Sequence, residues 1–367
     1  MEEERIKLLI NKYLANTLTE DERRELDRVL QRAPAVDTQK NLELTMGLIH
    51  RKRASQRQAR RIIGGGLALL VLVIGGYLLW PSSQKDLALV KTDIKMPLAE
   101  ITPGGDKAIL LLADGRRIRL DSIGNGAIPD NSGARALKQD KSSLVYNGSS
   151  GNGMHTLETP RAGQFMVQLP DGTKAWLNNA SSLRYATSFT GPTREVELTG
   201  EAYFEVARSP SQPFRVKVEG KVIDVLGTSF TVTAYKGTER ISTTLLTGKV
   251  RVSDGVTQRV LQPFEAVTIQ QGRRWELQTH VDTAGALAWK NGYFHFEDED
   301  LSGVMQQLGR WYDVDFDIQV SRTRTYNEEI NRNQPLSRVL QALGLSYQME
   351  GRRLIIKDST EDNSHDH

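Results

Sequence analysis

The stretch "IIGGGLALLVLVIGGYLLW", Ile62 to Trp80, runs for nineteen residues without a charged side chain. At ~1.5 Å of rise per residue, a helix of this length nearly matches the ~30 Å hydrocarbon core of a bilayer, and it satisfies its own backbone polar groups. A buried core helix and the apolar region of a signal peptide are the alternatives, but nineteen residues are long for either. The stretch therefore predicts a single transmembrane helix over 62–80.

The basic residues on the two sides of this stretch predict its orientation. Those on the N-terminal side are Arg51, Lys52, Arg53, Arg57, Arg60 and Arg61, whereas Lys85, Lys91 and Lys95 follow on the other side. Cytoplasmic flanks carry the excess of Lys and Arg, so these six residues act as topology determinants and place the N-terminus in the cytoplasm. The chain from Pro81 onward is then expected across the membrane.

Residues 1–61 show the apolar period of helices and predict a small all-α domain. The apolar positions that recur on one face are Ile6, Leu9, Ile10, Tyr13 and Leu14 in a first helix and Leu26, Val29 and Leu30 in a second. Thr19 and Glu22 form a capping box at the start of the second helix. A domain of ~60 residues buries little apolar surface alone, so these faces are candidates for a partner, the alternative being a self-contained anchor or spacer.

After a polar linker, 81–98, the apolar period changes from helical to alternating, and turn signals become frequent. The unit "ITPGGDKAILLLADGRRIRL" recurs as "ETPRAGQFMVQLPDGTKAWL", with Asp114-Gly115 and Asp171-Gly172 at matching positions. Asp-Gly is a favoured tight-hairpin turn. Residues 99–287 are therefore expected to form a β domain, either a sandwich, a barrel or a solenoid, with Gly124 to Gly153 as a loop or loose arm.

The pattern changes again in 288–358. A strand around Tyr293 to Phe296 precedes an amphipathic helix, and a second helix around Leu336 to Leu343 is followed by strands on either side of Gly351. This order predicts a small α+β domain. The tail 359–367 is polar and is expected to be disordered.

The chain offers little for catalysis. It has no cysteine, and its six histidines show no metal-binding spacing. Glu201 and Glu205 would lie on one face of a strand, roughly 13 Å apart at ~3.3 Å per residue, which is too far for a glycosidase pair. The aromatic residues Trp176, Tyr185, Tyr203 and Phe204 are more typical of a core than of a sugar-stacking platform. We expect no catalytic, cofactor-binding or metal-ligating residues.

The run "TPRAGQFMVQLPDGTKAWLNNASSLRYATSFTGPTREVELTGEAYFEVA", followed by "PFRVKV" and "VLGTSFTVTAY", resembles the FecR family of transmembrane anti-sigma factors. The segment "WKNGYFHFEDEDLSGVMQQLGRWYDV" is similar to the small domain, with a secretin and TonB short N-terminal fold, that accompanies FecR domains in Bacteroidetes-type proteins. The "TEDERREL" hairpin resembles the cytoplasmic sigma-binding segment of the family. Ala162 and Phe264 depart from the family pattern in stretches where glycine is more common, and both departures affect turns.

The resemblance implies signalling across two membranes by a single-pass protein of the inner membrane. A TonB-dependent outer-membrane transporter would present its signalling domain to the periplasmic part, and the cytoplasmic helices would hold or release an extracytoplasmic-function sigma factor. Regulatory proteases would cut the protein near the membrane, and no direct contact with nucleic acid is implied. The rival hypothesis is a membrane-tethered periplasmic protein that binds glycan or another envelope component, with the N-terminal helices as an anchor.

Overall fold

The computed structural model describes residues 100–148, 151–238, 240–270, 274–320, 324–350 and 353–357. All of them belong to one compact unit, Asp93–His367, whereas the other unit, Met1–Thr92, lies outside the described residues. The predicted helical domain 1–61, the apolar segment 62–80, the linker 81–98 and the tail 359–367 therefore fall outside the part of the chain that the structure describes.

The fold class expected from the sequence, which combined an all-α domain and a transmembrane helix with β and α+β domains, needs correction. Of the residues that the structure describes, 51% lie in strands and 11% in helices, so this part of the chain is mostly β. Within the described ranges, no helix has both the length and the apolar character needed to cross a bilayer. The reason is that apolar residues here alternate with polar ones and turns interrupt them, so that even α6, the longest described helix, has only twelve residues.

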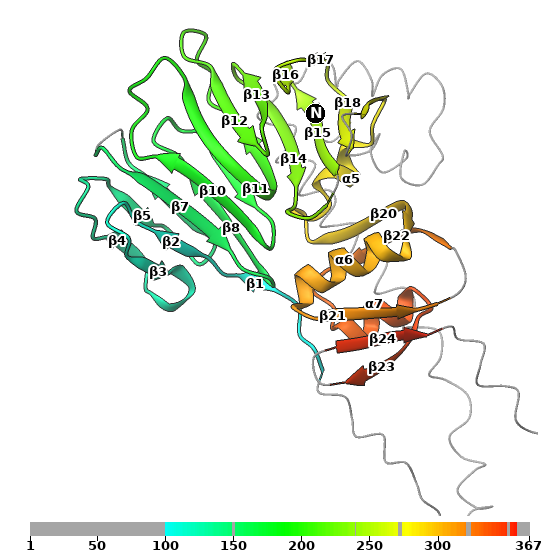
Figure 1. Ribbon diagram of the computed structural model, residues 1–367. Helices are drawn as coiled ribbons and strands as arrows, with labels where there is room; N and C mark the ends of the chain where they lie inside the picture. Colours follow the sequence, from blue (N-terminus) through cyan, green and yellow to red (C-terminus); the bar gives the residue numbers. More distant parts are fainter. Residues whose placement is uncertain are drawn as a thin grey trace, which may run out of the picture. The chain divides into compact units, whose positions relative to one another are not determined.

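Two β sheets form the larger part of the unit (Figure 1). The first contains, in order, β3 (Arg117–Arg119), β2 (Ile109–Leu111), β7 (Met154–Thr159), β10 (Ser181–Ala186), β11 (Arg194–Glu205), β12 (Phe214–Val218), β13 (Lys221–Val225), β16 (Val250–Ser253) and β17 (Gln258–Leu261). The second contains β4 (Gly126–Ile128), β5 (Ala136–Lys138), β6 (Ser143–Tyr146), β8 (Gly163–Gln168), β9 (Lys174–Leu177), β11 again, β14 (Ser229–Ala234), β15 (Arg240–Thr247), β18 (Glu265–Gln270) and β19 (Arg274–Thr279). Strand β1 (Gly105–Asp106) runs parallel to β8, and a 3₁₀ turn, Leu120–Ser122, follows β3.

Strand β11 belongs to both sheets. Residues 194–197 pair in parallel with β12, and residues 200–205 pair antiparallel with β14. Gly200 lies at the change of sheet with φ of 92°, and a Cβ built there would lie 2.7 Å from the Cα of Ser181. Only glycine fits this conformation and this contact without strain. The strand can therefore pass from one sheet to the other because residue 200 has no side chain.

One hydrophobic core is filled from both sheets. Side chains from the first sheet, such as Leu183 and Val216, belong to the same buried cluster as Phe204 and Phe230 from the second. The rings of Phe204 and Phe230 stack with their centroids 5.2 Å apart. The alternatives left open by the sequence are thus resolved in favour of two sheets that enclose a shared core.

The sequence repeat supplies one hairpin to each sheet. Gly115 and Gly172 have φ of 85° and 86°, and their N–H groups donate to Leu112 O at 3.0 Å and Leu169 O at 2.9 Å. The first turn joins β2 to β3, and the second joins β8 to β9. The predicted Asp-Gly turns are confirmed, and the two copies occupy different sheets.

The segment from Gly124 to Gly153 is not the loop that the sequence predicted. Its described residues contain strands β4, β5 and β6, and all four side chains of β6 are buried. Strands of three or four residues are too short for an alternating pattern to be recognised among glycines and asparagines.

The C-terminal residues form a smaller α+β domain with its own core. Its elements are α5 (Thr283–Leu287), β20 (Tyr293–Asp300), α6 (Leu301–Tyr312), β21 (Asp315–Gln319), β22 (Thr325–Asn331), α7 (Leu336–Ala342), β23 (Ser346–Glu350) and β24 (Arg353–Lys357). Strands β20 and β22 form one sheet, and β21, β24 and β23 form another. The Asp300 carboxylate caps α6 by accepting from Gly303 N at 2.7 Å. The predicted helices and strands of this domain are present, and α5 and β22 are additions.

The junction in β11 gives a prediction about stability. We expect Gly200→Ala to lower the free energy of unfolding by more than ~2 kcal/mol, because it adds a steric contact with Ser181 to the ~1–2 kcal/mol cost of the left-handed backbone. Gly172→Ala is the matched control, since Gly172 has a similar φ but no atom within 4 Å of the position that a Cβ would take. Urea unfolding of the purified chain measures both, and equal losses would contradict the role given to the contact.

Candidate functional site

The site residues predicted from the sequence lie outside the described residues. This applies to the eight apolar candidates for sigma-factor binding between Ile6 and Leu30 and to the six topology determinants between Arg51 and Arg61. They remain predictions. Within the described part, one set of polar and aromatic side chains lies where the C-terminal domain contacts the β sheets. We call this contact the seam, and its residues are Arg161, Trp176, Tyr203 and Tyr235 on the β-sheet side and Lys290, Arg310 and Arg332 on the other.

Arg161 is the main side chain of the seam. It lies in the turn between β7 and β8, and its guanidinium donates to the carbonyl oxygens of Gly309 (2.8 Å) and Val314 at the C-terminal end of α6. It also forms ion pairs with Asp315 (2.8 Å) and Asp313 (3.2 Å). A helix C-terminus carries partial negative charge and unsatisfied carbonyls, so a guanidinium from the other domain suits it. Arg161 thus anchors α6 to the β sheets.

The backbone next to Arg161 strengthens this contact. Ala162 N donates to Arg310 O at 2.8 Å, and Ala162 O accepts from Gly105 N at 3.0 Å. The φ of Ala162 is 55°, and that of Phe264 is 68°. Both residues that depart from the family's usual glycine therefore lie in the left-handed region, which explains why glycine is common at these positions.

Two cations of the C-terminal domain lie over aromatic rings of the β sheets. Lys290 Nζ is 4.7 Å from the ring centroid of Trp176 and 5.5 Å from that of Tyr203, and the Arg310 guanidinium is 4.0 Å from the ring of Tyr235. Such contacts are worth ~0.5–1 kcal/mol each when exposed. Charged groups, aromatic rings and backbone carbonyls therefore make contacts across the seam.

The aromatic residues considered from the sequence do not form a sugar-stacking platform. Tyr185, Tyr203 and Phe204 are buried, as expected of core residues. Trp176 is partly exposed, but it packs beside Tyr203 with ring centroids 5.3 Å apart, and Lys290 lies over both rings.

Arg332 is a buried cation within the seam that no motif or spacing in the sequence singles out. It is 2% exposed, its guanidinium lies 3.7 Å from the ring of Trp311, and it donates to Trp289 O (2.8 Å) and to Asn178 Oδ1 (3.0 Å). No described carboxylate lies within ion-pair distance of it. Burial lowers the pKa of Arg332 to about 10, so the group stays charged at neutral pH without a neutralising partner.

Glu201 and Glu205 both lie on β11 and have separate structural roles. The Glu201 carboxylate accepts from Asn178 Nδ2 (2.7 Å) and from the Tyr235 hydroxyl (3.2 Å), whereas Glu205 accepts from the Tyr203 hydroxyl (3.1 Å). These bonds fix side chains of the seam. They give no reason to treat the two carboxylates as an acid and base pair.

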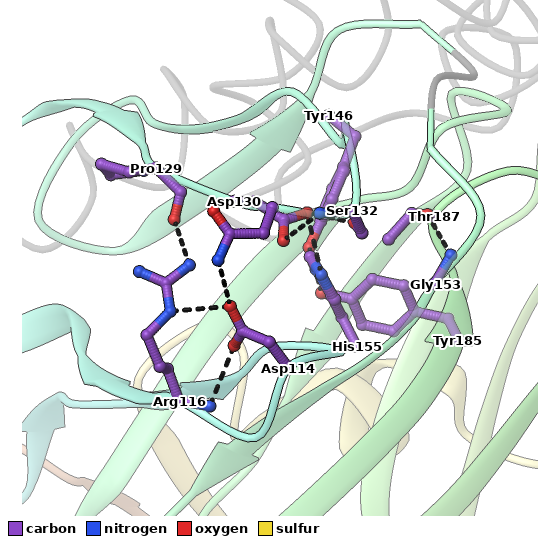
Figure 2. Close-up of polar contacts among 11 residues, drawn as sticks. Asp114, Arg116, Pro129, Asp130, Ser132, Tyr146, Gly153, His155, Tyr185 and Thr187 are labelled. Carbon is purple, nitrogen blue, oxygen red and sulfur yellow. Dashed lines mark hydrogen bonds and ion pairs between the residues drawn. The ribbon is translucent and has the colours of Figure 1, made fainter.

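A second polar cluster, also missed from the sequence, lies inside the β domain (Figure 2). His155 is fully buried, with Nδ1 2.6 Å from the Tyr146 hydroxyl and Nε2 3.2 Å from Asp130 Oδ2. The Tyr146 hydroxyl is 3.1 Å from that of Tyr185. Burial lowers the pKa of His155 although Asp130 opposes this shift, so the imidazole is neutral near pH 7.

This cluster contains an acid, an imidazole and a hydroxyl, but no substrate can reach it. The side chains of His155 and Asp130 have no solvent-accessible surface, and Asp130 is held by Ser132 through both its hydroxyl and its backbone N–H. General acid–base chemistry needs contact with the reacting group. The cluster therefore joins buried polar side chains within the β domain, and His155 Nε2 lies near Asp130 without forming a hydrogen bond. The described residues contain no group of three or more potential metal ligands.

Comparison with known proteins identifies what the chain is similar to. The family model described as FecR protein matches residues 155–251, and the one described as FecR, C-terminal, matches residues 293–356. Two crystal structures of a proposed anti-sigma factor from Parabacteroides distasonis, at 1.65 Å and 2.50 Å resolution, have TM-scores of 0.53. They share 31% and 29% identity, cover 56% of this chain, and are themselves covered over 99% and 100% of their length. No curated protein matches.

The contacts of Arg161 give a prediction about the seam. Arg161→Met removes two hydrogen bonds to carbonyls and two ion pairs, so we expect a loss of ~1–3 kcal/mol in the free energy of unfolding and faster hydrogen exchange in α6 and β21. Arg184→Met removes an exposed pair with Glu197 and should cost less than ~1 kcal/mol. Unchanged exchange in α6 would show that Arg161 does not anchor this helix.

The burial of His155 gives a prediction about pH. Its pKa is lower in the folded chain than the ordinary value of 6.5, so the unfolded chain binds more protons below that pH and stability declines as pH falls from about 6.5. The charged and titratable groups around it are Asp130, Asp114, Tyr146 and Tyr185.

We expect the stability of His155→Gln to fall less between pH 7 and pH 5 than that of the unchanged chain. The Gln amide does not titrate in this range, yet it can still form hydrogen bonds. His280→Gln, at an exposed position, should lose as much stability as the unchanged chain. Thermal unfolding of each variant is measured between pH 7 and pH 5. If His155→Gln loses as much stability as the unchanged chain, groups other than His155 cause the pH dependence.

Proposed function

The chain belongs to the FecR family of anti-sigma factors, and from this premise we propose that it holds an extracytoplasmic-function sigma factor inactive until a signal arrives from outside the cytoplasm. The observation that carries this proposal is the joint match of a FecR domain and a FecR C-terminal domain, together with similarity to an anti-sigma factor structure over its whole length. The family is regulatory, so the proposal involves no active site.

The N-terminal segment is the proposed sigma-binding part. Its two apolar faces, which include Leu9 and Leu26, would cover surfaces of the sigma factor that core RNA polymerase needs. What supports this is the amphipathic pattern of 1–61 and the small core that so short a domain can build for itself.

The signal is proposed to come from a TonB-dependent outer-membrane transporter, whose signalling domain would contact the FecR or C-terminal domain, with regulatory proteases acting afterwards. We place the chain at the inner membrane with its N-terminus in the cytoplasm and its C-terminus in the periplasm, on the basis of the basic residues at 51–61. The contacts of Arg161 with the end of α6 support a relay, since a partner that displaces α6 would disturb β7 and β8 directly.

The sigma-binding face gives a test of the proposal. Replacing Leu9 and Leu26 with Asp places charges in the predicted apolar faces, so we expect release of the sigma factor and increased transcription of its target promoter in the native host. Asn11→Asp introduces the same charge beside the first face and should keep repression. A promoter-fused reporter measures the change, and co-purification with the tagged chain measures binding.

Unchanged repression by the double variant would count against this face. If deletion of residues 2–50 also left transcription unchanged, the anti-sigma role would fail, and the rival hypothesis of a tethered envelope- or glycan-binding protein would be favoured.

A further inference from the structure

A cavity of about 960 Å³ lies at the seam. It is bounded by β11 and the turn between β14 and β15 on the β-sheet side, and by α5, β20 and α6 on the other. Small-molecule sites in proteins commonly measure ~300–1,000 Å³ and lie where domains meet. The cavity therefore has the size and position of a ligand site.

The cavity contains two guanidinium groups without a carboxylate partner. Arg310 packs on the Tyr235 ring and makes no side-chain hydrogen bond or ion pair with any residue that the structure describes. Arg332 bonds to a carbonyl and an amide, but its Nε has no partner among the described residues. Arginine binds carboxylates through paired N–H groups in a fixed geometry, and it does so most strongly in partly buried sites. An anionic ligand group would satisfy both cations.

The cavity also contains acceptors that need donors. Burial, and then the neighbouring Asp300, raise the pKa of Glu299, whose carboxyl has no hydrogen bond or ion pair to a described residue. Asn179 is 3% exposed, and its Oδ1 likewise has no partner within the described part of the chain. By contrast, Asp300 is engaged as the cap of α6. A ligand that fits must therefore bring hydroxyl or amide donors as well as an anionic group.

We propose that this cavity binds a small ligand that carries a carboxylate together with hydroxyl or amide donors. The carboxylate pairs with Arg310 in the positive field of Arg332, and the donors bond to Glu299 and to Asn179 Oδ1. An acidic sugar and a short acidic peptide share this chemistry. The site does not depend on the proposed function, because it is defined by binding alone.

The ligand also has a structural consequence. Since the cavity walls come from both domains, a bound ligand contacts the β sheets and the C-terminal domain together. Binding to the folded chain but not to the unfolded one raises the unfolding temperature. A bound ligand also stabilises the contact between the two domains, so amide hydrogen exchange in α6 becomes slower.

The test uses the purified full chain and two pairs of probes. Digalacturonic acid is compared with its neutral dimethyl ester, and the blocked dipeptide acetyl-Gly-Glu-amide with acetyl-Gly-Gln-amide, by calorimetric titration and thermal unfolding. We expect one acidic probe to bind and to raise the unfolding temperature, with its neutral counterpart at least about tenfold weaker. The acidic probe that binds more tightly shows whether the ligand is an acidic sugar or a short acidic peptide. Binding of neither acidic probe, or equal binding of the neutral ones, overturns the proposal.

Two substitutions locate the site. Arg310→Gln should weaken the acidic probe at least about tenfold, whereas Arg338→Gln, at a position of α7 outside the cavity, should leave its affinity unchanged. If Arg310→Gln unfolds the chain, Glu299→Met gives the second measurement and should weaken the binding of the acidic probe, because it removes both acceptor oxygens of this side chain. Unchanged affinity in a folded Arg310→Gln variant, or in Glu299→Met, overturns the assignment.

Discussion

The continuous backbone ladder of β11 is the constraint on which the rest of this structure depends. A single strand pairs with β10 and β12 in one sheet and with β9 and β14 in the other, so the two sheets cannot separate without breaking it. Gly200 makes this possible, because Ser181 occupies the space that a side chain would need. The same strand carries Glu201 and Tyr203 to the seam, and it therefore fixes the core and one wall of the cavity together.

The seam differs in kind from the two cores. The cores are closed by aliphatic and aromatic side chains, whereas the seam consists of cations on rings and a guanidinium on helix carbonyls. Contacts of this type are individually modest and leave room for water, so inter-domain surfaces of this composition are open to rearrangement. Arg332 is the extreme case, since its charge is buried there with no described carboxylate at ion-pair distance.

Local sequence was a good guide wherever neighbouring residues carry the signal. The Asp-Gly turns, the strands from Phe214 to Val252 and the two helices of the C-terminal domain follow from turn chemistry and from apolar period. The short strands β4 to β6 were missed, because three or four residues are too few to show an alternating period. The family pattern also marked Ala162 and Phe264, whose positive φ values explain the usual glycines.

By itself the sequence determined the β character of the FecR region, the helices of the C-terminal domain and, through its motifs, the family. Only the tertiary structure decided that β11 is shared by two sheets, that His155 meets Tyr146 and Asp130, and that Arg161 and Arg332 each contact the other domain. These contacts join residues far apart in the chain, Arg332 and Asn178 being 154 positions apart. The apolar period and the turn residues depend on a few neighbouring positions. By contrast, the contacts between charged side chains and aromatic rings depend on how complete sheets pack against each other.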